Sequence, residues 1–176
     1  EGLQTGHLRV GQPEKVAHYP VSLRSLNQAA SARSMGPDPK LDDSTTVTMM
    51  LTADTMLHPK YLEPSAPVLS LRCDENTTAA TIWFSGFFMG DFAGMGRVDY
   101  RIDDRPAKHR NFEVSTANEH LGLWTGAKSI GFIQELIDGR TLYIEATPVN
   151  ENTVNATFDI AGLSEAIKPL RESCGW

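Results

Sequence analysis

The chain has 176 residues, a formal net charge of −6 and 40% hydrophobic residues, a size that buries one core of ordinary dimensions. Its 16 lysines and arginines are scattered rather than gathered in a patch, which excludes nucleic acid and anionic membrane as expected partners. No window approaches the roughly 18 consecutive apolar residues of a membrane span. We therefore expect one domain preceded by an N-terminal arm.

The N-terminal segment lacks the periodicity of a helix or a strand. SLNQAASARSMGPDPK is rich in Ser, Ala and Pro, and its Pro-Asp-Pro can continue neither a helix nor a central strand. We expect residues 1–40 to be an arm or linker, with VAHYPVSLRSL as a candidate short strand, and residues 41–176 to be the domain. Because the chain starts at Glu1, we also expect an export signal to have been removed before it.

Short alternating runs separated by turn residues begin after Asp42. In TTVTMMLTA and VLSLRC the apolar residues occupy every second position, which predicts half-buried strands. Four later runs have the same texture: TAATIWFSG, RVDYRID, TLYIEATPV and TVNATFDIA. Most links between them are too short for crossover helices, so the strands should pair antiparallel. The expected fold class is mainly β (α+β), an antiparallel β-sandwich or half-barrel.

One internal segment has helical spacing instead. AKSIGFIQELIDGR places four apolar residues on one face, Ile130, Ile133, Leu136 and Ile137, which predicts an amphipathic helix at about 127–138. Gly139 supplies the stop signal.

The last segment predicts a short C-terminal helix at about 164–174, with Ser164 as its cap. Pro169 should either lie in the first turn or kink this helix. Its apolar stripe carries Cys174 towards the core, where the strand ending at Cys73 can meet it. Two cysteines with one in the last turn favour a disulfide and an oxidising compartment, and two unrelated buried thiols are the alternative. The bridge would close a loop of about 100 residues.

A Gly-rich connection, GFFMGDFAGMG, joins two of the predicted strands. Its spacing matches neither the dinucleotide fingerprint nor the phosphate loop, and no helix pattern follows it. Five large apolar residues lie in it and form our candidate binding loop: Phe87, Phe88, Met89, Phe92 and Met95. We expect some of them to fill the open end of the sandwich and the rest to form a contact surface.

The titratable residues form no recognisable catalytic set. The five histidines lack the spacing of a zinc site, so we expect no metal and no cofactor. Asp99, Arg101 and Asp103 should share one strand face as a solvated, charge-compensated ladder. A cation site there, or a cell-wall hydrolase with Asp99, Asp103 or Asp104 as its acid, is the alternative. We expect no enzymatic activity.

Several segments resemble, in order and spacing, the VasI/TagO family of type VI secretion-associated proteins. They are LRCDENTTAATIWF, VDYRIDD, FEVSTANEHLGLWTG, IGFIQELIDG, LYIEATPVNE and FDIAGLSEAIKPLRESCGW. The resemblance runs from about Lys40 to Trp176, and the last segment is its most specific part. Members carry a Trp-containing strand just before the position of LDDSTTV, where this chain has SMGPDPK.

The resemblance implies an exported protein of the bacterial envelope without established catalytic activity. We expect a periplasmic accessory or adaptor protein that binds a protein partner in the envelope or the secretion apparatus, with peptidoglycan as a second candidate ligand. A structural module related to phage or prophage is the alternative.

Overall fold

The computed structural model of the chain describes residues 31–34 and 46–176. The candidate strand within VAHYPVSLRSL and most of the predicted arm, residues 1–40, lie outside these described residues. The described part of the arm is β1 (Ser31–Ser34), which pairs antiparallel with β2 (Val47–Thr52).

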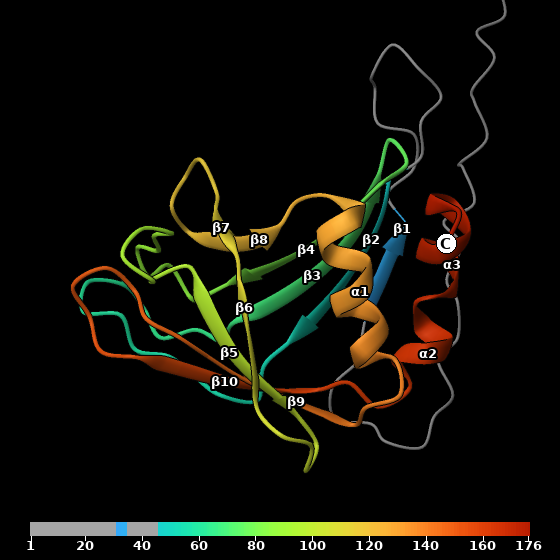
Figure 1. Cartoon of the computed structure of the whole chain (residues 1–176). Coiled ribbons are helices and arrows are strands. Elements are labelled where there is room, and N and C mark those ends of the chain that lie inside the picture. The colour runs from blue at the N-terminus through green and yellow to red at the C-terminus, as the bar shows by residue number, and fades with distance from the viewer. Residues whose placement is uncertain (1–30, 35–45) are drawn as a thin grey trace, which may run out of the picture.

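Two antiparallel sheets face each other in Figure 1. The first sheet has the order β1-β2-β3-β4-β8-β7 and the second β10-β9-β5-β6. The remaining strands of the first sheet are β3 (Val68–Asp74), β4 (Thr77–Trp83), β7 (Glu113–Val114) and β8 (His120–Leu123). Those of the second are β5 (Arg97–Ile102), β6 (Lys108–Asn111), β9 (Thr141–Ala146) and β10 (Val154–Asp159). The predicted mainly β class with antiparallel pairing is confirmed, and the arrangement is a sandwich.

The core lies between the two sheets because the side chains of each strand alternate between its faces. In β3, Leu69 and Leu71 are fully buried, whereas Arg72 between Leu71 and Cys73 is exposed. In the second sheet, Val98 and Ile144 are likewise fully buried and point towards the first. The alternation read from the sequence therefore predicts correctly the apolar face of β3 and β5.

Helix α1 (Gly126–Leu136) packs against β4 and covers one side of the space between the sheets. It matches the helix predicted at 127–138, although the centre of its buried face is Phe132, a residue outside the expected stripe. The Phe132 ring meets Tyr100 edge to face at 5.4 Å between centroids and Phe112 at 5.6 Å. Edge-to-face contact is a geometry that aromatic pairs prefer. Through it, the Phe132 ring joins the helix to the second sheet.

The C-terminal segment forms two short helices, α2 (Leu163–Ala166) and α3 (Lys168–Cys174), instead of the single helix expected at 164–174. Pro169 lies in the first turn of α3, where its missing N–H costs nothing. A continuous helix would place the proline ring against the carbonyl four residues earlier. Ser164 is not the cap: Gly162, at φ 82°, precedes α2 and no side chain caps it.

Two interactions attach the end of the chain to the first sheet, and a third orders the terminal tryptophan against α3. Cys73 and Cys174 form a disulfide with their Cα atoms 5.8 Å apart. The Trp176 indole Nε1 donates a hydrogen bond to Thr78 Oγ1 at 2.8 Å. Arg171 lies over the Trp176 ring at 5.1 Å from its centroid and donates from Nε to the Trp176 carbonyl at 3.2 Å. The terminal tryptophan is therefore half-buried and held by two hydrogen bonds.

Glu135 connects α1 to β5 and β6 on the molecular surface. Its carboxylate accepts hydrogen bonds from Tyr100 Oη at 3.1 Å, Lys108 Nζ at 2.9 Å and Arg110 Nη2 at 3.2 Å. Partial burial raises the pKa of Glu135, but hydrogen bonds from Lys108 and Tyr100 and the charges of Lys108 and Arg110 outweigh it, so the pKa lies below its usual value. The ionised form is the one that these donors favour.

We predict that replacing both bridging cysteines, Cys73→Ala with Cys174→Ala, lowers the free energy of unfolding by about 4–5 kcal/mol, because the bridge closes a long loop in the unfolded chain. The two cysteines are 101 residues apart. Denaturant titration of the oxidised protein, the reduced protein and the variant measures the loss. Thiol titration of unfolded, unreduced protein should find no free thiol, and two free thiols would contradict the bridge.

We also predict that Glu135→Gln lowers the free energy of unfolding at pH 7 by about 1–2 kcal/mol, since it removes a charge that accepts three hydrogen bonds. The folded pKa of Glu135 lies below the ordinary 4.5. Its stabilisation is thus complete above that pH and is lost as the pH falls through the lowered pKa. Wild type and variant should converge in acid when denaturant curves are compared across pH.

The control for that experiment is Glu165→Gln. Glu165 near the end of α2 pairs with Lys168 at the start of α3, and its side chain is 76% exposed. We expect this variant to lose less than about 0.5 kcal/mol. An equal loss from both variants at pH 7 would contradict the special role of Glu135.

Candidate binding surfaces

The five residues of the candidate binding loop divide between the core and the surface. Met89 is completely buried and Phe87 is packed against the core, so these two fill the end of the sandwich. Met95 is half-buried. Phe88 and Phe92 are 56% and 58% exposed. Both outcomes expected for this loop therefore occur, each for different residues.

The loop backbone that carries the two exposed rings is fixed from several sides. Met89 donates its N–H to the carbonyl of Asn118 at 2.7 Å, and Phe88 accepts from Val149 N–H at 2.9 Å. The Asp91 carboxylate accepts the N–H of Val114 at 3.2 Å. These bonds connect the loop to the β7–β8 turn, to β7 and to the β9–β10 connection. The Gly-rich loop is thus built into the fold.

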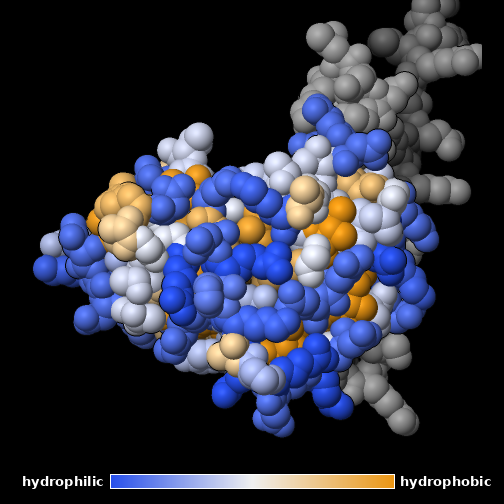
Figure 2. Space-filling model, in the orientation of Figure 1, coloured by the Kyte–Doolittle hydropathy of each residue, from blue (hydrophilic) through white to orange (hydrophobic). Residues whose placement is uncertain are grey.

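Leu62 extends the exposed apolar area. It is 55% exposed, and its Cδ1 lies 2.5 Å from the position that a Cβ would take on Gly86. Gly86 has φ 82°, so it supplies both the left-handed turn and the space under Leu62. We call Leu62, Phe88 and Phe92 the apolar loop surface. Figure 2 shows an apolar patch over the β4–β5 loop, bordered by hydrophilic surface.

A second surface is a hollow of about 630 Å³ on the outer face of the first sheet, a volume within the range of ligand sites. We call it the indole groove. Its lining residues are Thr48, Met50, Val68, Ser70, Arg72, Thr81, Trp83, Glu119, His120 and Trp124. They come from β2, β3, β4 and the region around β8, so the groove crosses the middle of the sheet.

The pairing register explains why the sheet is hollow there. Ser70 lies opposite Thr81, and Thr81 lies opposite Gly122, so a row of small residues crosses three strands. The next outward-facing row contains Trp83 between Val68 and His120. Arg72 and Trp124 lie on the other side of the small row. Small residues therefore form the floor and large ones the walls.

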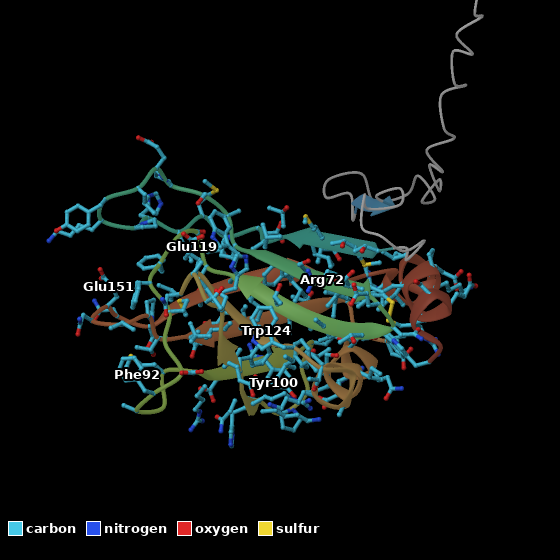
Figure 3. The ribbon with its side chains drawn as sticks, turned by 90° about the horizontal axis from the view of Figure 1, so that it is seen from above. Arg72, Phe92, Tyr100, Glu119, Trp124 and Glu151 are labelled. Carbon is cyan, nitrogen blue, oxygen red and sulfur yellow. A yellow bond between two sulfur atoms is a disulfide. The ribbon has the colours of Figure 1, made fainter. Side chains whose placement is uncertain are left out.

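Trp124 depends on the glycine in that row. A Cβ on Gly122 would lie 2.5 Å from both Cε2 and Cζ2 of the Trp124 indole, so the ring lies directly on the glycine. The indole Nε1 donates to the carbonyl of Glu113 at 3.2 Å. One ring face is against the strand and the other faces the groove. In Figure 3, Arg72 and Trp124 lie over the first sheet, and Glu119 lies nearer the end that carries Phe92.

Four polar side chains of the groove have no hydrogen-bond partner among the described residues. This holds for the hydroxyls of Ser70 and Thr81, the Trp83 Nε1 and the Arg72 guanidinium. Ser70 and Thr81 lie side by side on the floor. These groups can therefore bond to a ligand without breaking an existing protein contact.

The acidic strand region is organised differently from the expected ladder. Asp99 pairs with Arg97, with Nη2 to Oδ1 at 2.6 Å. Asp103 does not share its face, because β5 ends at Ile102 and Asp103 turns at φ 51°. There the Asp103 carboxylate accepts the backbone N–H groups of Arg140 and Thr141 at 3.0 and 2.9 Å.

Those two backbone hydrogen bonds lower the pKa of Asp103. A general acid for glycoside cleavage needs a raised pKa. The hydrogen bonds of Asp103 are those of a structural turn residue, and its lowered pKa argues against the alternative acid role.

Across residues 31–34 and 46–176, no group of three or more His, Cys, Asp or Glu side chains is arranged to hold a metal ion. No helix within those ranges is long and apolar enough to cross a membrane.

A family model described as type VI secretion system VasI, EvfG, VC_A0118 matches residues 22–176. The chain belongs to the VasI family. No curated protein matches it significantly. Among solved structures, the crystal structure of invasion associated protein B from Bartonella henselae aligns with a TM-score of 0.45 and 10% identity, covering 81% of this chain and 96% of that chain.

Sequence reasoning found the apolar loop of this VasI-family protein and missed the indole groove. Strand alternation alone identifies the residues on the outer face of β3 and β4: Ser70, Arg72, Thr81 and Trp83. What was missing was β8, a strand of only four residues. Without it, nothing in the sequence brings Trp124 beside the outer face of β4.

We predict that Gly122→Ala displaces the Trp124 indole, because the added methyl group would overlap the ring. The tryptophan emission should shift to the red, and the free energy of unfolding should fall by about 1–3 kcal/mol. Gly131→Ala is the matched control, since a Cβ there meets nothing within 4 Å. In helix α1 it should raise stability by up to about 1 kcal/mol without changing the emission. Unchanged emission in Gly122→Ala would contradict the stacked indole.

Proposed function

We propose that this VasI-family protein is an exported, non-catalytic adaptor of the bacterial envelope that binds a protein of the type VI secretion apparatus. The observation that supports it is the apolar loop surface, where Phe88 and Phe92 are more than half exposed on a backbone fixed by hydrogen bonds. Membership of the family directs the proposal to the secretion apparatus.

The energetics of exposed rings favour a partner. Each phenylalanine that leaves water contributes about 1.5–3 kcal/mol, and aromatic anchors dominate binding energy at interfaces. The hydrogen bonds at Met89, Phe88 and Asp91 fix the loop before any partner arrives, so little ordering entropy is lost on binding. Asp91 and Arg97, both exposed, supply a polar rim.

Export is supported by the disulfide between Cys73 and Cys174. Such bridges persist in oxidising compartments such as the periplasm and are rare in the cytosol. A periplasmic location would also bring the protein within reach of the wall, and peptidoglycan is the second ligand class that we propose. The apolar loop surface offers few polar side chains for sugar hydroxyls, so a wall ligand would use another surface.

We predict that Phe88→Ser with Phe92→Ser weakens capture of the protein partner at least tenfold, about 1.4 kcal/mol, while the free energy of unfolding changes by less than about 0.5 kcal/mol per substitution. The bait is the purified oxidised protein. The source is a detergent extract of the envelope of the bacterium that encodes it, cleared of sacculi by centrifugation. Bound proteins are identified by mass spectrometry, and the dissociation constant is then measured with the purified partner.

Two control variants bracket that result. Met50→Ser changes a methionine of similar exposure, 48%, in the indole groove. It should leave capture unchanged. Met89→Ala removes a buried side chain of the same loop and should cost about 2–5 kcal/mol of stability. Undiminished capture by the folded Phe88/Phe92 variant would refute the loop as the interface. Unfolding of every loop variant would show that the loop is part of the core.

A further inference from the structure

We propose that the indole groove is a saccharide-binding site, and that its ligand is the glycan strand of peptidoglycan with its peptide stems. The inference is independent of the protein partner of the apolar loop surface, because the two surfaces share no residue. It rests on the proposed periplasmic location and on peptidoglycan as the second proposed ligand class.

The groove crosses strands whose backbone is already paired. Its floor, Ser70 and Thr81, belongs to β3 and β4, and each of these strands has a partner on both sides. No free strand edge lies in the groove, so a peptide cannot add to it as a further strand. Recognition must come from side chains alone.

Those side chains have the character that a sugar ring requires. A pyranose has an apolar C–H face and polar edges, and an indole presents a flat apolar face of similar size together with one N–H donor. Trp124 lies flat on Gly122 with its outer face free. Trp83 stands in the opposite wall, half-buried. Two indoles on one concave surface can contact successive sugar units.

The floor supplies the polar half of the recognition. Ser70 and Thr81 are adjacent hydroxyls, and each can both donate and accept. Neither has a partner among the described residues, and Trp83 Nε1 is also without one there. A sugar hydroxyl or an acetamido group donates and accepts in the same way. A proline-rich peptide would use the indoles as well, but it offers fewer groups for two free hydroxyls.

Charge at the two ends of the groove selects the kind of glycan. Arg72 and Glu119 both line it, and Figure 3 shows them towards opposite ends of the first sheet with Trp124 between them. The side chains of both are exposed and have no ion-pair partner among residues 46–176. Peptidoglycan carries carboxylates and amines on its stems, whereas a neutral glycan carries neither. A ligand with both charges complements both ends.

The test uses the full oxidised chain and four probes. Purified sacculi are tested by co-sedimentation. Soluble disaccharide muropeptides, chitotetraose and a polyproline peptide are titrated against tryptophan emission. Chitotetraose has the same kind of N-acetylated sugar backbone without the carboxylate.

Three groove variants are compared with wild type: Trp83→Ala, Thr81→Tyr and Arg72→Gln. Tyrosine suits an outward strand position, so Thr81→Tyr should fold while it fills the floor.

We expect wild type to sediment with sacculi and to change its emission with muropeptides and chitotetraose. Trp83→Ala and Thr81→Tyr should weaken both soluble ligands at least about tenfold, the effect of losing an aromatic anchor or its access. Arg72→Gln should weaken muropeptides by about tenfold and chitotetraose by less than about twofold. The Phe88→Ser, Phe92→Ser variant should bind all of them like wild type.

Three results would overturn the assignment. One is the failure of wild type to bind sacculi. Another is equal binding by wild type, Trp83→Ala and Thr81→Tyr when all three are folded by circular dichroism. The third is saturable binding of the polyproline peptide in preference to muropeptides, which would assign the groove to a peptide partner. None of these results bears on protein capture by the apolar loop surface, which is measured in extract free of sacculi.

Discussion

The pairing register of β3 with β4 determines both faces of the first sheet. With Leu71 opposite Ala80, the inward row joins the core and the outward row holds Ser70 and Thr81. Because side chains alternate with a period of two, a slip of one residue would expose Leu71 and turn the groove floor into the core. The same register aims Cys73 inward, where Cys174 meets it. Core, bridge and groove therefore depend on one alignment.

The elements that the sequence predicted correctly are those in which hydrophobic period and length were both strong. β3 and β9 alternate over six or seven residues, and α1 covers a full apolar stripe. The strands that were missed have weak local signals. β6 reads KHRN, without an apolar residue, and β7 has only two residues. Such edge strands form because a neighbouring strand offers backbone partners, a tertiary cause that no local pattern contains.

The candidate surfaces show the same division. The apolar loop was visible because Phe88 and Phe92 lie close together in the sequence. The backbone that presents these two rings is held by contacts with Asn118 and Val149, which are distant along the chain. The groove combines residues from four strands, β2, β3, β4 and β8. A sequence pattern can thus find a surface built from one segment, while a surface built across strands needs the sheet order.

The disulfide and the hydrogen bonds of the C-terminal segment hold the sheet beneath the groove in place. Thr78, opposite Cys73 in the register, receives hydrogen bonds from two elements. Ser129 Oγ of α1 donates to its carbonyl, and Trp176 Nε1 donates to its hydroxyl. With the disulfide, these bonds hold the β3–β4 hairpin from the core side, directly beside Arg72. A face supported in this way changes little on binding, and a preformed site loses less entropy when a ligand arrives. The terminal Cys and Trp, which at first look like a reactive thiol and a loose ring, therefore help to keep the outer face of the sheet in a fixed shape.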